Sequence, residues 1–381
     1  MFYSKLNALR GVAAILVAGF HFFLPYENTV PLIRNAALFV DFFFILSGFV
    51  IWKSYHRSIR TGAVRFRQFA FLRLMRLYPA HFFIMMAWLA AIGGRYAAAR
   101  FLGIGSTDLG YNTPGLFFEN LLLINCYGLS RDLGWNFPSW SISAELFAYL
   151  VFFIAYVPRG AFSSSRKPHP WRPFLFSALC YLALWIIGLS LSQPDLSFRH
   201  SDFGFLRAMA GFFIGVGIAQ LDFGRILKRR GAAADTFLEL LLVAAATGLV
   251  SVSGSDYGLQ MAVMLGFAVV VAYFSGQSQG LVSRLLDTRV MQYCGQISYS
   301  FYLWHMFAFL SCTELAKIVF HTEMTATDHV AGNAKWLVII AAFSLTTVLS
   351  VLTYHLVEQP FRCWSKDYAA RTWRREPSAA R

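Results

Sequence analysis

The sequence Leu9-Arg10-Gly-Val-Ala-Ala-Ile-Leu-Val-Ala-Gly-Phe-His21 opens the first long apolar segment of the chain. A second follows after a short polar break, as Phe39-Val-Asp41-Phe-Phe-Phe-Ile-Leu-Ser47-Gly48-Phe-Val-Ile-Trp52. Each segment is long enough to cross a bilayer, and each carries one ionisable residue deep inside it, His21 or Asp41. Because an ionisable group in hydrocarbon is costly, it usually faces a protein interior and marks a functional site.

The composition indicates a polytopic helical membrane protein. Apolar residues make up 57% of the chain and charged residues only 14%. The formal net charge of +14 could suggest a nucleic-acid partner, but basic residues beside membrane spans account for it without one. The five cysteines show no paired or CxxC spacing, so we expect neither a metal site nor a disulfide framework. The first apolar segment has no small-residue cleavage site, so no cleavable signal peptide is expected.

The hydropathy pattern predicts an all-α fold of about ten transmembrane helices around a central cavity. The expected spans are 9–27, 36–52, 77–94, 138–157, 174–193, 203–221, 236–253, 258–275, 293–313 and 335–357. A further apolar piece, 116–127, is short for a full crossing. We therefore expect 95–137 to form an external loop that dips partly into the membrane. Residues 1–360 form the transmembrane domain in this prediction, and 361–381 form a basic cytoplasmic tail.

The basic residues predict the orientation of these spans. Lys and Arg are dense in 53–76, in the loops at 159–172 and 225–230, and in the tail from Arg362. Cytoplasmic loops carry such an excess. All four stretches fall on one side of the membrane only if 116–127 does not cross it, which makes both termini cytoplasmic.

Four ionisable residues in four predicted helices fall at matched depth. With a helical rise of ~1.5 Å per residue, His21, Asp41, Glu145 and His305 lie roughly 16–21 Å above the cytoplasmic face, near or just above the middle of the apolar core. This match predicts a lined cavity. A carboxylate beside an imidazole fixes its tautomer and raises its basicity, so a pair of His21 and Asp41 predicts a general base.

Structural explanations for the same residues stay open. His305 could form a hydrogen bond between helices, and Glu145 could belong to the N-terminal chemistry of the fourth span. The His21–Asp41 pair could be a purely structural ion pair. Ser47-Gly48 is expected to permit close helix contact rather than to supply a nucleophile.

The segment Arg73-Leu-Met-Arg76-Leu-Tyr-Pro79 places two arginines one helical turn apart, so that they project from one face. Pro79 suits the first turn of a helix or would kink a longer one. With Arg10, these arginines form a cationic group at the cytoplasmic mouth of the expected cavity. Guanidinium groups hold phosphates, so a phosphate-bearing cosubstrate is expected. Cytoplasmic arginines of membrane proteins need no ligand, however, and that alternative also remains.

Six stretches, read together, resemble the acyltransferase 3 family of bacterial membrane enzymes. They run in the family's order over nearly the whole chain: Arg10 with His21 eleven residues later, Val40-Asp41-Phe-Phe-Phe-Ile-Leu-Ser-Gly48-Phe-Val, Arg73-x-x-Arg76-Leu-Tyr-Pro79, Pro138-Ser-Trp140-Ser141-Ile-Ser-Ala-Glu145-Leu-Phe, Ile297-Ser-Tyr-Ser-Phe-Tyr-Leu-Trp304-His305 and Val357-Glu358-Gln-Pro360-Phe361. The family's usual Trp-Ser-Leu-Ser-Val-Glu followed by an aromatic residue differs here at Ile142, Ala144 and Leu146, although the acid is kept.

The resemblance implies transfer of an acyl group, commonly acetyl, from cytoplasmic acyl-CoA to a hydroxyl of an extracytoplasmic or lipid-linked glycan, in a bacterial inner membrane. It implies that Arg10, His21, Arg73 and Arg76 are needed for activity. No permanently bound cofactor or metal is expected, because a thioester is already activated. A covalent route through His21 is a variant of direct transfer.

The site residues expected from both lines of reasoning fall into three groups. The catalytic group is His21, Asp41 and Glu145, the acyl-CoA group is Arg10, Arg73 and Arg76, and the acceptor group is Trp140, Ser141 and His305. The competing class is a transporter or carrier of an anionic or acylated small molecule, for which buried ionisable residues are also usual. The sequence shows neither an inverted repeat nor paired broken helices, which favours the enzyme.

Overall fold

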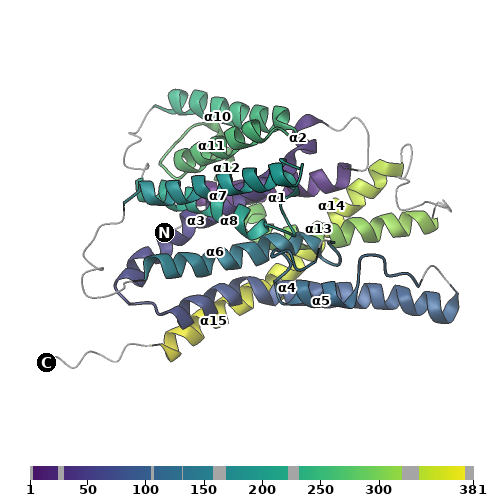
Figure 1. The fold of residues 1–381 in the computed structure, drawn as a ribbon. Coiled ribbons are helices and arrows are strands. Elements are labelled where there is room, and N and C mark those ends of the chain that lie inside the picture. Colours follow the sequence, from purple (N-terminus) through teal and green to yellow (C-terminus); the bar gives the residue numbers. More distant parts are fainter. Residues whose placement is uncertain are drawn as a thin grey trace.

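The computed structural model describes residues 3–24, 30–103, 107–130, 132–157, 169–221, 231–319 and 334–373, and within these ranges its regular structure is helical (Figure 1). The α-helices are α1 (Ser4–Phe23), α2 (Pro31–Arg34), α3 (Phe39–Arg60), α4 (Phe66–Leu102), α5 (Pro114–Leu121), α6 (Trp140–Tyr156), α7 (Trp171–Ser190), α8 (Gly204–Leu221), α10 (Ala232–Ser253), α11 (Tyr257–Phe274), α12 (Leu281–Leu286), α13 (Arg289–Val319), α14 (Ala334–Thr353) and α15 (Gln359–Thr372). The basic residues expected in loops at 159–168 and 225–230, and the tail beyond 373, lie outside the described residues.

The prediction of an all-α polytopic membrane protein is confirmed. Nine helices in the described ranges are long and apolar enough to cross a membrane. The expected span 293–313 lies in α13, which is 31 residues long but carries more polar residues, among them Ser298, Ser300 and His305. With α13 included, a helix corresponds to each of the ten expected spans.

Two helix boundaries differ from the prediction in ways that matter for the site. Helix α4 already begins at Phe66, so Arg73 and Arg76 belong to it, and Pro79 lies inside the helix rather than in its first turn. Helix α5 has only eight residues, about 12 Å, and therefore does not span a bilayer, as expected. Helix α14 continues through a π-helical turn at Tyr354–Glu358 into α15. Part of the predicted tail is therefore a helix.

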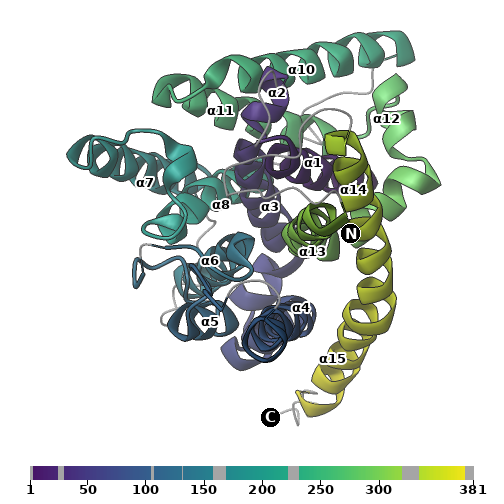
Figure 2. The ribbon, with the colours of Figure 1, turned by 90° about the vertical axis from the view of Figure 1, so that its right-hand side faces the viewer.

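The middle of the bundle is formed by α1, α3 and α13 (Figure 2). Helix α3 packs most closely against α8, where glycines allow the two backbones to approach. A Cβ atom on Gly48 would lie 1.8 Å from the carbonyl oxygen of Phe212, and one on Gly215 would lie 1.8 Å from that of Ile45. The expectation that Gly48 permits close helix contact is confirmed.

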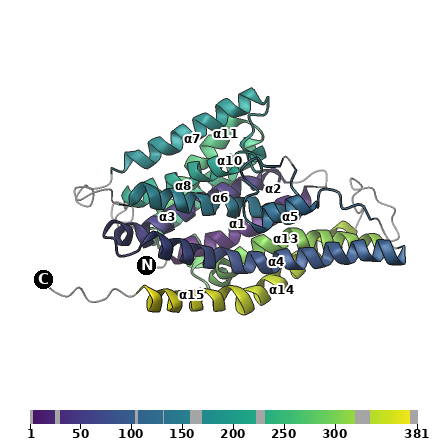
Figure 3. The same ribbon diagram turned by 60° about the horizontal axis from the view of Figure 1, so that its bottom comes forward.

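The bundle has two distinguishable ends. Helix α1 begins, α3 ends, α4 begins and α15 ends toward the left of Figure 1, and Figure 3 shows the same arrangement from another direction. The basic segment 53–76 therefore lies at the end of the bundle where α15 finishes. The assignment of this end to the cytoplasm remains a prediction.

Candidate active site

A cavity of about 660 Å³ lies at this basic end, and we call it the cation-lined cavity. Helices α1, α4 and α15 provide its charged lining: Arg10, Arg73, Arg76, Arg362 and Lys366. Its other residues include Tyr3, Asn7, Tyr55, Gln296, Tyr354, Gln359 and Ser365. The three arginines expected from the sequence to form one cationic group thus come together, and α15 adds two further cations.

A smaller cavity of about 140 Å³, the central cavity, adjoins the first one. Arg10, Arg73 and Arg76 line both of them. The central cavity is also lined by Ser141 and Glu145, which are two of the expected site residues. It therefore extends from the arginines toward the interior of the bundle.

A third cavity of about 590 Å³, the histidine cavity, contains His21. It shares two lining residues, Val40 and Tyr302, with the central cavity, and these side chains stand between the two spaces. The rest of its lining includes Phe20, Arg34, Phe137, Trp140, Ser197, Phe198, His200 and Arg207. The three cavities form a row from the basic end of the bundle to His21.

His21 contacts His305, and not Asp41. Its Nδ1 atom lies 3.1 Å from Nε2 of His305 and 3.0 Å from the carbonyl oxygen of Val17. The two imidazole rings are 4.8 Å apart between centroids. His305 is completely buried and lines none of the three cavities, so it lies behind His21 and supports it.

The hydrogen bonds of the two rings determine where their protons lie. Nδ1 of His305 contacts only a carbonyl oxygen, that of Tyr302, and must therefore carry a proton and donate it. In the neutral ring, Nε2 of His305 is then an acceptor. It can accept a hydrogen bond only from His21, so Nδ1 of His21 must carry a proton. The N–H group at Nδ1 of His21 is shared between Nε2 of His305 and the carbonyl oxygen of Val17. With this assignment, Nε2 of His21 is unprotonated and has a free lone pair, which is the state that a general base requires.

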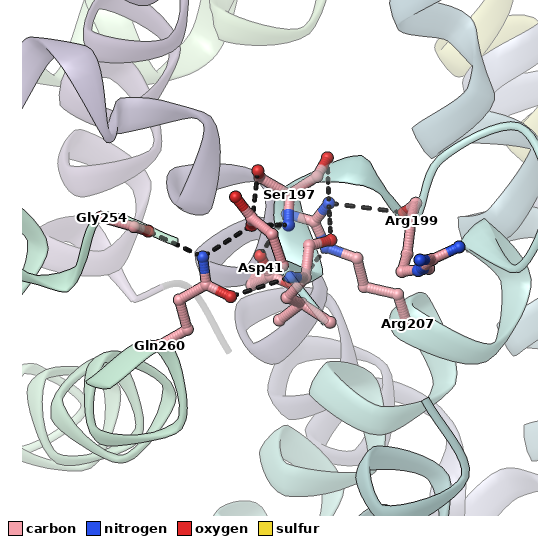
Figure 4. A network of polar contacts seen from close by, with 8 residues as sticks. Asp41, Ser197, Arg199, Arg207, Gly254 and Gln260 are labelled. Atoms are coloured by element: carbon pink, nitrogen blue, oxygen red, sulfur yellow. Dashed lines mark hydrogen bonds and ion pairs between the residues drawn. The ribbon is translucent and has the colours of Figure 1, made fainter. Parts of the chain in front are cut away.

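Asp41 is held by an arginine that the sequence prediction did not include, so the predicted His21–Asp41 pair is wrong. Arg207 of α8 donates from Nε to Oδ1 of Asp41 at 3.0 Å and from Nη2 to Oδ2 at 2.6 Å, and both side chains are almost completely buried (Figure 4). Both carboxylate oxygens are thus engaged in a bidentate, charge-assisted pair. Matched depth was not enough to predict contact, because Asp41 points from α3 toward α8 rather than toward α1.

Arg207 also fixes the segment between α7 and α8. Its Nη1 atom donates to the carbonyl oxygen of Leu196 at 3.0 Å. Gln260 of α11 donates to Asp195 at 2.7 Å and to the carbonyl oxygen of Gly254 at 2.9 Å (Figure 4). These bonds hold in place the segment that brings Ser197 and His200 to the histidine cavity.

His200 is an uncharged polar group of this cavity near neutral pH. Burial, together with the positive charge of Arg207, lowers the pKa of His200 to about 4. Its ring centroid lies 6.2 Å from that of Trp140, and the Arg207 guanidinium lies 5.4 Å from the Trp140 ring centroid. Trp140 thus lies on the cavity wall between a neutral imidazole and a cation.

Glu145 lies in the central cavity and accepts hydrogen bonds from the hydroxyls of Ser47 and Tyr149. It sits in the second turn of α6, and its side chain makes no bond to the backbone at the start of that helix. This excludes the capping alternative for Glu145. Ser47 thus serves as a hydrogen-bond donor to Glu145.

The three expected arginines differ in how far their charges are neutralised. Arg76 forms an ion pair with Glu358 from the π-helical turn. Arg73 donates to the Tyr55 hydroxyl at 2.7 Å and stacks on that ring, but it has no carboxylate partner among the described residues. Arg10 forms no hydrogen bond or ion pair with any residue that the structure describes, although it lines two cavities. The space between the three arginines is therefore suited to an anion, because two of the guanidinium groups have no carboxylate partner among the described residues.

The acceptor group of the prediction is divided among three places. Trp140 lines the histidine cavity, Ser141 lines the central cavity, and His305 is buried behind His21. Ser141 donates to the Tyr302 hydroxyl at 2.9 Å, and so helps to hold one of the side chains between the two cavities.

Sequence reasoning missed Arg207, Glu358, Arg362 and Lys366. A lone arginine inside an apolar span was the available signal for Arg207, since such a cation needs a buried acid. No group of His, Cys, Asp and Glu in the described part of the chain is arranged to hold a metal ion.

Comparisons with known proteins place the chain in a family. A family model described as "Acyltransferase domain" matches residues 3–355. The Bacillus subtilis (strain 168) protein named "Putative peptidoglycan O-acetyltransferase YrhL" is 24% identical over 375 residues, which cover 94% of this chain and 54% of that protein. The Komagataeibacter xylinus protein named "Putative membrane-bound transacylase BcsY" is 26% identical over 368 residues, which cover 93% of this chain and 81% of that protein.

This chain thus spans about half the length of the Bacillus protein. No solved structure matches it. Because the family match covers nearly the whole chain, it favours an acyl-transferring enzyme over the transporter or carrier.

Proposed function

The chain belongs to the acyltransferase 3 family, and from this membership we propose that it moves an acyl group, in the first place acetyl, from cytoplasmic acyl-CoA to a hydroxyl of an extracytoplasmic or lipid-linked glycan. The observation that carries the proposal is the row of three adjoining cavities, which begins at a cluster of cations and ends at the cavity that contains His21. We place the enzyme in a bacterial inner membrane with both termini cytoplasmic.

The donor end of this route is the cation-lined cavity. The phosphates of acyl-CoA would lie among Arg10, Arg73 and Arg76, of which the first two have no carboxylate partner among the described residues. Guanidinium groups are suited to this task because they present several donors to one phosphate. The extended pantetheine arm would then pass along the central cavity, beside Glu145, and between Val40 and Tyr302 to His21.

The acceptor end is the histidine cavity. Phe137 and Trp140 offer flat apolar surfaces, while Ser197 and His200 offer hydrogen-bonding groups. This mixture of a few placed polar groups among aromatic side chains is typical of sites for small polar ligands such as sugars. A glycan acceptor also agrees with the name of the Bacillus relative, which refers to peptidoglycan O-acetylation.

The chemical step follows from the proton positions of the two histidines. Nε2 of His21 takes the proton of the acceptor hydroxyl while that oxygen attacks the thioester carbonyl carbon. The tetrahedral intermediate then expels the CoA thiolate, the C–S bond breaks, and the thiolate recovers the proton from the His21 imidazolium. The products are an O-acyl ester and free CoA. His305 acts as a positioning residue, because it accepts the Nδ1 proton of His21 and so keeps Nε2 basic.

The test uses membrane vesicles with their cytoplasmic face outward, from cells with and without this chain, supplied with acetyl-labelled acetyl-CoA. Label should enter a glycan fraction only when the chain is present, and mass spectrometry should find an acetyl-sized increment there. The His21→Ala variant should lose at least about 100-fold in rate, since a positioned general base contributes that much or more.

Two controls make this test decisive. Labelled free acetate should give no product, and His21→Ala protein should be recovered in wild-type amounts as a single species on size-exclusion chromatography. Wild-type rates with the His21→Ala variant would contradict the role of the base. Absence of glycan label with the wild-type chain would contradict the proposed donor and acceptor.

A further inference from the structure

We propose that α15 supplies a second part of the donor site, in which Arg362 and Lys366 bind the 3′-phosphate of coenzyme A. This inference rests on the proposed function, because it takes acyl-CoA as the occupant of the cation-lined cavity. Helix α15 lies beyond residue 355, where the match to the family model ends.

One face of α15 is turned toward the cavity. Gln359, Arg362, Ser365 and Lys366 all line it, and residues three or four positions apart share a face of a helix. Arg362 is half-buried and Lys366 is exposed. Two cations one helical turn apart therefore project into the same space.

The other side of α15 is anchored to α4 by aromatic contacts. The Phe71 ring lies 5.3 Å from that of Tyr368 and 6.1 Å from that of Trp364. These contacts, together with the packing of α15 on α4, fix the rotation of α15 about its axis. The direction of Arg362 and Lys366 is therefore set by the fold.

The π-helical turn before α15 places a carboxylate next to the cation-lined cavity. Such turns are rare and often occur at functional sites. This one turns Glu358 inward, where it pairs with Arg76 and lies 3.5 Å from Arg362. Among the described residues, Glu358 is the carboxylate that pairs with the cations of this cavity, Arg76 and Arg362. Lys366 has no carboxylate partner among the described residues. The cavity therefore keeps a positive excess.

The cations along the row of cavities fall into two groups, one for the diphosphate of coenzyme A and one for its 3′-phosphate. Arg10, Arg73 and Arg76 also line the central cavity, whereas Arg362 and Lys366 line only the cation-lined cavity. If the thioester arm enters the central cavity, the diphosphate to which that arm is attached lies near the shared arginines. The 3′-phosphate is attached to the ribose, further along the molecule, and carries roughly −1.5 to −2 charge. It would then lie at α15.

The experiment measures binding, and so needs no acceptor. Full-length protein in a neutral detergent is titrated with CoA and with 3′-dephospho-CoA by isothermal titration calorimetry. Wild-type protein should bind CoA about tenfold or more tightly than 3′-dephospho-CoA, since a hydrogen bond to a charged group is worth about that factor. In the variant Arg362→Gln/Lys366→Gln the ratio of the two Kd values should fall toward one.

Arg371→Gln is the matched control, because Arg371 lies on the same helix but does not line the cavity, and it should keep the wild-type ratio. An unchanged ratio in the double variant, with tight CoA binding, would overturn the role of α15 and leave the proposed donor intact. Failure of the wild-type protein to bind CoA would overturn both.

A lipid headgroup is the other source of phosphate that could meet these two cations. Adding phosphatidylglycerol to the wild-type titration should therefore leave the ratio of the two Kd values unchanged. Loss of CoA discrimination on addition of that lipid would assign Arg362 and Lys366 to the membrane surface instead.

Discussion

At the scale of single residues, Asp41 and Arg207 form a buried ion pair that joins α3 to α8. Each side chain is at most 1% exposed, and two hydrogen bonds join them. A buried charge that loses its partner is strongly destabilising, because its desolvation is no longer offset. Asp41 is therefore expected to act on stability first, while His21 acts on turnover.

The Asp41→Ala variant should be destabilised by about 3–5 kcal/mol, because it leaves Arg207 buried without a counter-charge. The measurement is the thermal unfolding of purified protein in detergent, and the expected result is a clearly lower Tm than that of wild-type or His21→Ala protein.

The double variant Asp41→Leu/Arg207→Met removes both charges and should recover much of the lost Tm, since apolar replacement of a buried pair is often tolerated. The prediction fails if Asp41→Ala keeps the wild-type Tm and loses only acyl transfer. That outcome would return Asp41 to the role of partner for His21.

At the scale of elements, glycines determine how closely the central helices approach. The α3–α8 contact has Gly48 on one side and Gly215 on the other, each against a carbonyl oxygen of the opposite helix. Backbone atoms cannot move aside as a flexible side chain can, so any added methyl group must separate the helices. This contact also carries Asp41 and Arg207, and so couples helix packing to the ion pair.

Gly48→Ala should therefore destabilise the protein by about 1–3 kcal/mol or more, the usual cost of overpacking. Gly93→Ala is its control, because Gly93 also lies inside a long helix, α4, but a Cβ atom added there would meet no atom of another described element within 4 Å. The yield of monodisperse protein and its Tm should fall for Gly48→Ala only. Equal behaviour of the two variants would contradict the close α3–α8 contact.

Helix number and type could be predicted from the sequence because long apolar runs report membrane spans directly. The start of α4 at Phe66 could not, since the arginines up to Arg76 marked that part of the chain as a basic loop beside the membrane. The π-helical turn and α15 were missed for a related reason, because the charged residues after Glu358 look like a tail. Charged residues in the sequence show where a segment leaves the membrane. They do not show where the helix ends, because the helix can continue outside the membrane.

At the scale of the whole molecule, the site is assembled from helices that are far apart in the chain. The histidine cavity draws on α1, α6, α8 and the segment before α8, while the cation-lined cavity draws on α1, α4, α13 and α15. Helix α1 takes part in both, with Arg10 near its beginning and His21 near its end. The length of this one helix sets the distance from the proposed phosphate site to the proposed base.

Sequence reasoning placed Arg10, Arg73 and Arg76 together correctly, because one helical turn and one membrane face were enough to do so. It paired His21 with Asp41, whereas the partner of His21 in the structure is His305. Depth along a helix follows from residue counting, but the direction of a side chain around the helix depends on which neighbours pack against it. Only the three-dimensional arrangement of α1, α3, α8 and α13 supplies that direction.

The central claim is that the acyl donor reaches His21 by passing between Val40 and Tyr302, and Val40→Trp tests it most directly because it fills this passage. The measurement is acetyl transfer from labelled acetyl-CoA in the vesicle assay, compared with the CoA affinity of the same purified protein. We predict that transfer falls at least about 100-fold while the Kd for CoA stays at the wild-type value, which also shows that the protein is folded. Wild-type transfer by Val40→Trp would contradict the account.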